Sequence, residues 1–322
     1  MVICSEGVED MNSLLNKLIE ECRPYTNQGH VATYIPELAN ANADAIGICI
    51  VQDAKVIGFA GEYTTLFTMQ SVVKPIILLQ ALMDSGIEKV RALVGVEATG
   101  KPFDAFNYSD QALTGAHINP MINTGAIALC TLIHGDTYAG KFARLLDMTR
   151  KLAGNPTLDI DPAVYHSECE TGNKNRALGY MLKAYGMVSD PVEEILDCYF
   201  RACSILVSCK DLARISLVFA NHGLRIRDGV RLFPIEYGKY VNATMATCGM
   251  YDGSGRFAVE VGVPTKSGVG GGLMAPVYGR CGIGIYGPAL DQNGNCIAGC
   301  EMMKHLSREM GLHMFQDRQS GC

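Results

Sequence analysis

Apolar residues near the start of the chain recur with the period of an α-helix. Six of them fall at i, i+3, i+4, i+7, i+8 and i+11: Met11, Leu14, Leu15, Leu18, Ile19 and Cys22. This spacing predicts an amphipathic helix that ends before Pro24. The pattern then changes to two runs rich in β-branched residues, 45–52 and 55–59, which predict a hairpin turning at Asp53-Ala54.

The middle of the chain returns to helical spacing. Residues 71–83 are apolar almost all round, which predicts a buried helix ending near Ser85-Gly86. Four more segments have the spacing of helices, and glycines separate them: 142–152, 176–185, 191–200 and 211–221. After residue 259 glycine becomes frequent, and strands are expected at 282–286 and around Cys296-Ile297, with a turn at Asn293-Gly294 between them. A last helix is expected at 302–310.

The order is therefore helix, strands, helices, strands, helix. Early and late strands most simply join in one sheet, and the helices between them then form a second lobe. This order predicts an α+β fold with a sheet lobe from about 30–70 and 245–322 and a helical lobe from about 71–244. No repeat or low-complexity linker divides the chain, so residues 1–322 are expected to form a single unit.

Composition narrows the function classes. The 322 residues carry a net charge of −6 with no run of Lys or Arg, which argues against nucleic acid and against an anionic membrane surface as partners. None of the 13 cysteines forms a C-x-x-C pair, so a zinc or iron–sulfur site is not expected. The sequence shows no export signal and no membrane-spanning stretch, and we expect a cytoplasmic protein with reduced, buried cysteines.

Ser71 and Lys74 carry the first sign of chemistry. Three residues apart at the start of a helix, they place a hydroxyl and an amine on one face. A serine becomes a nucleophile when a neighbour takes its proton, and a buried lysine can do so. Short S-x-x-K matches also arise by chance, but this is the only one in the chain, and an unpaired lysine in an apolar helix would be costly.

Lys266-Ser267-Gly268 is the second element. It is an ordinary surface turn or an edge strand whose backbone binds a substrate and supplies an oxyanion donor. The glycines behind it would allow close approach of the backbone. With Ser71 and Lys74, this pair of elements is typical of acyl transfer through a serine.

Three further clusters are ambiguous alone. Asn119 to Gly125 is either a turn or a pair of asparagines reaching into a cleft. Ser167-Glu168 and residues 172–176 fit a solvated loop that caps the next helix. Tyr199 and Tyr251 fit half-buried packing residues, although a tyrosine beside a lysine can move a proton.

Taken together, these clusters resemble the serine-dependent glutaminases, which share the fold of serine β-lactamases and penicillin-binding proteins. The resemblance runs from about His30 to the last helix, on eight stretches in family-like order: 31–38, 67–74, 119–127, 167–168, Asn175, Tyr199 with 203–204, 248–252 and 264–272. It implies a serine β-lactamase-like fold in which an antiparallel sheet is flanked by helices and accompanied by a helical lobe.

The resemblance also implies roles for individual residues. Ser71 corresponds to the nucleophile, Lys74 to its partner and Tyr251 to a residue that helps proton transfer. The backbone N–H groups of Ser71 and Val269 correspond to the oxyanion hole. The positions that hold glutamine correspond to Tyr34, Asn123, Glu168, Asn175 and Tyr199, with Glu168 suited to the α-ammonium and Tyr34 and Asn123 to the α-carboxylate.

The expected activity is hydrolysis of L-glutamine to L-glutamate and ammonia through an ester on Ser71, without metal or cofactor. Whether Lys74 or Tyr251 is the base stays open, and they can titrate as a coupled unit. The resemblance further implies a homo-oligomer, a dimer or tetramer. Two alternatives remain: another cytoplasmic acyl-serine hydrolase of the same fold, which a penicillin would label, and a catalytically silent glutamine-binding module, which would bind without turnover.

Overall fold

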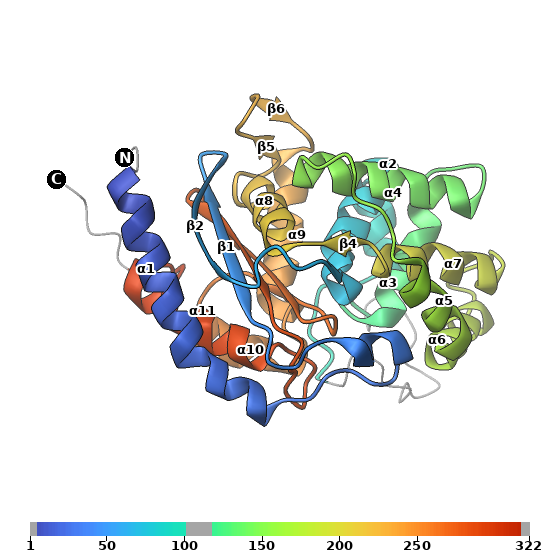
Figure 1. Ribbon diagram of the computed structural model, residues 1–322. Coiled ribbons are helices and arrows are strands. Elements are labelled where there is room, and N and C mark those ends of the chain that lie inside the picture. Colours follow the sequence, from blue (N-terminus) through green and yellow to red (C-terminus); the bar gives the residue numbers. More distant parts are fainter. Residues whose placement is uncertain (1–4, 101–117, 317–322) are drawn as a thin grey trace.

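The computed structural model describes residues 5–100 and 118–316, and its centre is one antiparallel sheet (Figure 1). The five strands lie in the order β2-β1-β9-β8-β7, so strands from the two ends of the chain meet in the middle. They are β1 (Gly47–Gln52), β2 (Lys55–Gly61), β7 (Lys266–Ser267), β8 (Gly272–Val277) and β9 (Cys281–Tyr286). The predicted α+β fold with an antiparallel sheet is confirmed, as is the hairpin at Asp53-Ala54. Of the two alternatives for Lys266-Ser267, the structure shows the edge strand and not the surface turn.

The sheet is buried on both faces, which explains the unbroken apolar run of β1. Ile48 and Ile50 point into a core shared with α1 (Ser5–Cys22), α10 (Ser254–Glu260) and α11 (Ile297–Met310). Cys49 and Val51 point into the larger core on the other side. Alternate side chains of a strand face opposite ways, so a strand covered on both sides has no polar positions.

Glycines in β9 let a helix lie directly on the sheet. A Cβ at Gly284 would stand 2.1 Å from the Cys209 oxygen, and one at Gly282 would stand 2.0 Å from the Ala213 oxygen. Both oxygens belong to α8 (Cys209–Ala220), which lies inside the range 71–244 expected for the helical lobe and nevertheless covers the sheet. Ser216 of α8 also donates a hydrogen bond to the Ile283 carbonyl at 3.0 Å.

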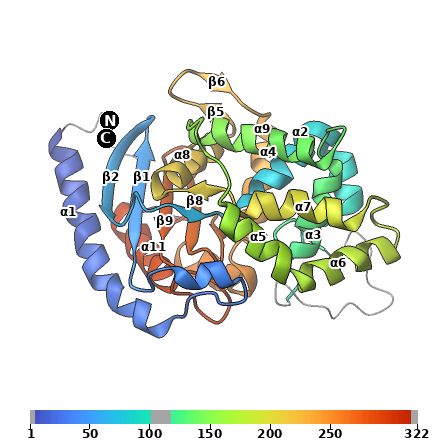
Figure 2. The same ribbon diagram turned by 45° about the vertical axis from the view of Figure 1, so that its right-hand side comes forward.

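The remaining helices gather beside the sheet, as both views show (Figures 1 and 2). They are α2 (Lys74–Leu93), α3 (Asn123–Leu129), α4 (Tyr138–Ala153), α5 (Pro162–Thr171), α6 (Asn173–Ala184), α7 (Val192–Cys203) and α9 (Ile235–Cys248). Two short ribbons, β3 (Phe67–Thr68) with β4 (Leu206–Val207) and β5 (Leu224–Arg225) with β6 (Val230–Arg231), and several short 3-10 turns are the other described elements. No helix of the described residues is both long and apolar enough to span a bilayer.

The β3–β4 ribbon delivers the chain to the start of α2. Phe67 pairs with Val207, and the Met69 N–H donates to the Ile205 carbonyl at 2.8 Å. A short 3-10 turn, η3 (Gln70–Val73), follows and carries Ser71. Ser71 therefore lies where the sheet and the helices meet.

One predicted boundary is confirmed and another is wrong. The helix expected to end near Ser85-Gly86 does end there, because Gly86 takes a non-helical backbone with a φ of 80°, and a second helix follows this kink to Leu93. The strand expected around Cys296-Ile297 is the start of α11, because the Cys296 sulfur accepts the Gly299 N–H at 3.2 Å and caps the helix. Among the described residues, the one strand-like contact of Cys296 is an isolated β-bridge to Leu290.

We predict that Gly284→Ala lowers the free energy of unfolding by about 3 kcal/mol, because its methyl group would overlap the α8 backbone and force the helix off the sheet. Urea titration of both proteins measures the change. Gly255→Ala is the matched control, since a Cβ there meets nothing within 4 Å. It should leave stability unchanged or raise it by up to about 1 kcal/mol, because alanine favours helix. Equal stabilities for Gly284→Ala and the wild type would contradict direct packing of α8 on β9.

Candidate active site

The Ser71 hydroxyl and the Lys74 amine lie next to each other inside the protein. Lys74 Nζ is 2.9 Å from Ser71 Oγ, and Lys74 is fully buried. The residue before Ser71 adopts an unusual backbone: Gln70 has a φ of 47°, a left-handed conformation that non-glycine residues rarely take. The sharp entry into the 3-10 turn brings the serine hydroxyl to the surface of a cavity.

Asn123 links Lys74 to two more of the predicted residues. Its Oδ1 accepts hydrogen bonds from Lys74 Nζ at 2.6 Å and from the Tyr199 hydroxyl at 3.3 Å. Its Nδ2 donates to Asn175 Oδ1 at 2.9 Å. Three helices, α3, α6 and α7, thus contribute one polar side chain each to a single network around the amine.

Tyr251 approaches Ser71 from the other side. Its backbone has a φ of 53°, and its hydroxyl donates to the Ser267 carbonyl at 3.3 Å. Burial raises the pKa of the Tyr251 phenol well above its usual range, and a hydrogen bond with Ser71 offsets only part of that effect. The phenol is therefore protonated at neutral pH.

Lys266 supports Tyr251 from behind the sheet edge. Its amine lies 4.3 Å from the centre of the Tyr251 ring and donates to the Gly249 and Ser267 carbonyls at 3.1 and 2.6 Å. Burial lowers the pKa of Lys266 well below its usual range, and the charge of Lys74 lowers it further. Two buried amines this close repel each other when both are charged.

Glu168 is the buried acidic group of the cavity, whereas Asp252, which also lines it, is exposed. It is 4 % exposed, and its Oε2 has no hydrogen-bond partner. Burial raises the pKa of Glu168 to about 8, although the charge of Lys74 and a hydrogen bond with Gln70 act in the opposite direction. A buried carboxyl with an unfilled oxygen is suited to receive a cation.

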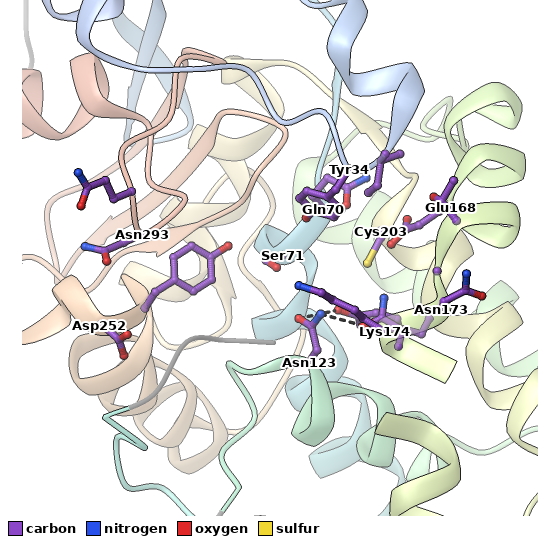
Figure 3. Close-up of a pocket in the computed structure, with 17 residues that line it drawn as sticks. Tyr34, Gln70, Ser71, Asn123, Glu168, Asn173, Lys174, Cys203, Asp252 and Asn293 are labelled. Carbon is purple, nitrogen blue, oxygen red and sulfur yellow. Dashed lines mark hydrogen bonds between the residues drawn. The ribbon is translucent and has the colours of Figure 1, made fainter. Parts of the chain in front are cut away.

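One cavity of about 420 Å³ joins these residues (Figure 3). Glu168, Cys203 and Asn123 project into it from the helices, Asp252 and Asn293 lie on the opposite wall, and Ser71 lies between them. The predicted site residues that line it are Tyr34, Ser71, Asn123, Glu168, Asn175, Tyr199 and Tyr251. Lys74 lies behind Ser71 and reaches the cavity through its hydrogen bonds.

Val269 contributes no side chain to the cavity. The side chain packs against Ala32 and Leu290 instead. Its neighbours hold the backbone close to Ser71, since a Cβ at Gly268 would stand 2.7 Å from the Met69 oxygen and one at Gly270 would stand 2.3 Å from the Thr68 oxygen. No hydrogen bond within residues 5–100 and 118–316 uses the Val269 N–H. Asn119 also stays outside, because its side chain bonds the Glu97 carbonyl and the Met121 N–H.

Sequence reasoning gave no substrate role to several residues that line the cavity. Ile35, Gln70, Cys203 and Asp252 were noted only within the similar stretches, and Gly172, Asn173 and Lys174 only within the cluster 172–176. Thr171, Gln292 and Asn293 lay outside both sets. Gln70 was available as the neighbour of Ser71, whereas Gln292 and Asn293 suggested only a turn. Among the described residues no three His, Cys, Asp or Glu side chains are grouped so that they could hold a metal ion.

Comparison with known proteins decides the family. Residues 29–315 match the family model described as Glutaminase. The chain is 48% identical to the glutaminase of Clostridium tetani and 47% identical to glutaminase 2 of Clostridium perfringens, in each case over 95% of this chain and the whole of the relative. The chain belongs to the glutaminase family. The prediction of a glutaminase from the residues is confirmed.

A solved glutaminase has the same fold. The Bacillus subtilis enzyme, in a covalent complex with 5-oxo-L-norleucine formed from 6-diazo-5-oxo-L-norleucine, superimposes with a TM-score of 0.87 at 36% identity, covering 94% of this chain and 99% of that one. The expected serine β-lactamase-like fold is consistent with this structure.

We predict that Glu168 makes stability fall as pH rises. The folded state keeps Glu168 protonated up to about pH 8, whereas the unfolded chain releases the proton near 4.5, so the stabilisation is complete below pH 4.5 and is lost through pH 8. Relative to Glu168→Gln, which does not titrate, the wild type should lose about 2 kcal/mol between pH 6 and 8. Urea unfolding at both pH values measures the difference. Glu170→Gln, on the exposed side of α5, is the control and should follow the wild type. A pH-independent difference for Glu168→Gln would contradict the burial argument.

Proposed function

We propose that this glutaminase hydrolyses L-glutamine through an ester on Ser71. The observation that carries the proposal is the 2.9 Å contact between Lys74 Nζ and Ser71 Oγ at the wall of a cavity that also holds one unpartnered carboxyl oxygen, Oε2 of Glu168. Glutamine brings a cation, an anion and a carboxamide, and this pocket offers one buried acid, several neutral donors and a nucleophile.

The first step forms the ester. Lys74, in its neutral amine form, accepts the Ser71 proton and becomes an ammonium while Oγ attacks the side-chain amide carbon of glutamine. The raised pKa of Tyr251 supports this assignment, because a phenol that is protonated at neutral pH donates a proton more readily than it accepts one. The backbone N–H groups of Ser71 and Val269 stabilise the oxyanion, and the unused Val269 N–H supports that role.

The second half returns the enzyme to its starting state. The carbon–nitrogen bond breaks, and the leaving nitrogen takes a proton from Tyr251 or Lys74 and departs as ammonia. Water then attacks the ester, the bond to Ser71 Oγ breaks, and the hydroxyl regains its proton as glutamate leaves. Asn123 holds Lys74 in place throughout, since its Oδ1 can only accept from the amine.

The α-carbon groups of glutamine occupy the far end of the cavity. Glu168 receives the α-ammonium at its unpartnered Oε2. Tyr34, Asn123, Asn175 and Tyr199 offer neutral polar groups for the remainder of the substrate, and Tyr34, 56 % exposed, lies at the entrance. The expected homo-oligomer and cytoplasmic location stay predictions, and sedimentation of the purified protein tests the first.

We predict that Ser71→Ala lowers glutamate formation by at least about 10³-fold, because the ester cannot form. The exposed Ser189→Ala variant is the control and should keep wild-type turnover. The second measurement uses 6-diazo-5-oxo-L-norleucine, which reacts covalently with the Bacillus subtilis enzyme. Peptide mass spectrometry should place its adduct on Ser71. Turnover near normal in Ser71→Ala, or an adduct on another residue, would rule out the proposed nucleophile.

We further predict that kcat/KM for L-glutamine rises with pH towards a plateau above about pH 8, because the carboxyl that receives the α-ammonium must first ionise. Glu168→Gln should lose this dependence between pH 6 and 8 and raise KM by about 10²-fold. Tyr251→Phe should keep the rise of kcat/KM between pH 6 and 8 and should lower kcat instead. If Glu168→Gln had the same pH profile as the wild type, the rise would belong to another group.

A further inference from the structure

A second cavity, of about 240 Å³, lies behind the turn that carries Tyr251. It opens between α10, the start of α11, the loop 291–295 and the 3-10 turn Arg23–Gln28, which contributes Tyr25 and Gln28, and it lies outside the cavity that contains Ser71. Met250, Phe257 and Ile297 give it apolar walls. The loop 291–295 borders both cavities, because Gln292 and Asn293 also line the first one.

Asn295 lines this cavity and carries a buried acceptor without a partner. The residue is 3 % exposed, and its Nδ2 donates to the Met250 carbonyl at 3.3 Å. Since a carbonyl can only accept, this contact fixes the orientation of the amide. Its Oδ1 is then left without a partner, out of contact with solvent. A ligand that fills the position must donate a hydrogen bond.

The charges around the cavity leave one carboxylate without a cation. Glu260 pairs with Arg256 and Lys304 at 2.8 Å each, and Lys304 also pairs with Glu301 at 2.7 Å. Asp291 takes part in none of the ion pairs among the described residues, and its Oδ1 accepts the N–H groups of Asn293 and Asn295 at 2.9 Å each. The five charged side chains therefore sum to one negative charge, which belongs to Asp291.

The start of α11 offers little to an anion. The Ile297 N–H donates to the Ala289 carbonyl at 3.0 Å, the Gly299 N–H to the Cys296 sulfur at 3.2 Å and the Cys300 N–H to the Cys296 carbonyl at 2.9 Å. These N–H groups are thus already bonded within the chain. The cavity therefore favours a ligand that has a hydrogen-bond donor, a positive charge and an apolar part.

We propose that this cavity binds an alkyl primary ammonium ion and that its occupation raises glutamine turnover. The ammonium group bonds Asn295 Oδ1 and the Asp291 carboxylate, and the alkyl chain contacts Met250 and Phe257. Butylammonium has five heavy atoms, and at about 30 Å³ each, the share of a water molecule, they fit the available volume. The binding claim stands by itself, whereas the effect on turnover rests on the function proposed above.

The link to catalysis runs through Tyr251. Asn295 holds the carbonyl of Met250, the residue directly before it. Ser254 Oγ accepts the Met250 N–H at 3.0 Å and donates to the Tyr251 carbonyl at 2.7 Å, closing a turn in which Tyr251 has a φ of 53°. A ligand on Asn295 stabilises this turn, and with it the position of the phenol beside Ser71.

The binding test titrates the full-length protein with n-butylammonium by isothermal calorimetry. n-Butyltrimethylammonium, which keeps the charge and the chain but has no N–H donor, is the matched probe. Asp291→Asn removes the negative charge of the side chain but keeps an oxygen that can accept the N–H groups of Asn293 and Asn295. Glu301→Gln is its control, because that carboxylate is already paired with Lys304. Glu168→Gln removes the carboxyl of the first cavity that could also hold an ammonium.

We expect butylammonium to bind the wild type, Glu301→Gln and Glu168→Gln alike, and Asp291→Asn at least tenfold more weakly. The trimethyl probe should not bind. Wild-type affinity in Asp291→Asn, equal affinity for the two probes, or binding lost in Glu168→Gln would each overturn the site. If Asp291→Asn does not fold, the binding site is tested by titrating the wild type and Glu168→Gln with the two probes.

Turnover is measured as glutamate formed, and each protein is compared with itself in the presence and absence of butylammonium. Butylammonium should raise it about fivefold in the wild type, the lower end of common allosteric couplings, and leave Asp291→Asn unchanged. If butylammonium bound without changing turnover, the proposed link to catalysis would be wrong and the proposed binding site would stand. If the wild type formed no glutamate from glutamine, the proposed function would fail and the coupling with it, whereas the calorimetry would still decide the binding site.

Discussion

The site depends on a backbone contact that only glycine allows. Gly268 and Gly270 place the turn after β7 against residues 68–72, so closely that a Cβ at either position would overlap a backbone oxygen. This contact holds the edge of the sheet, with the backbone of Val269, against the segment that carries Ser71. Ser71, Lys74 and the helical wall are positioned from one side of the contact, and Tyr251 and Lys266 from the other.

The same contact between the sheet edge and residues 68–72 also affects the charges in the cavity. Taking Lys74, Lys266 and Glu168 out of water lowers the pKa of Lys266 and raises that of Glu168, so the empty site carries fewer charges than its residues would in water. In the complex proposed above, the α-ammonium of glutamine lies beside Glu168 and favours the ionised carboxylate that burial disfavours.

Much of the fold could be predicted from local patterns, because helices with regular spacing and the 53–54 turn are specified by adjacent residues. Ser71 and Lys74 could be found in the same way, since their spacing is a property of one helix. The contacts among Asn123, Asn175 and Tyr199 could not, because three helices bring them together and only the family resemblance pointed to them. Gln292 and Asn293 were missed because a turn signal does not tell which cavity the turn borders, and Cys296 was misjudged because a sulfur cap has no strong sequence signature.

The pairing of β1 with β9 has a consequence for the synthesis of the protein. Ile48 lies opposite Ile285, so the inner edge of the β1–β2 hairpin has no partner until residues 281–286 have left the ribosome. Until then the growing chain exposes an unpaired and largely apolar strand edge, the kind of surface on which chains join one another. The nascent protein therefore exposes this edge until β9 has been made, and a chain that ends before Cys281 would keep Tyr251 but lack the central strand of the sheet.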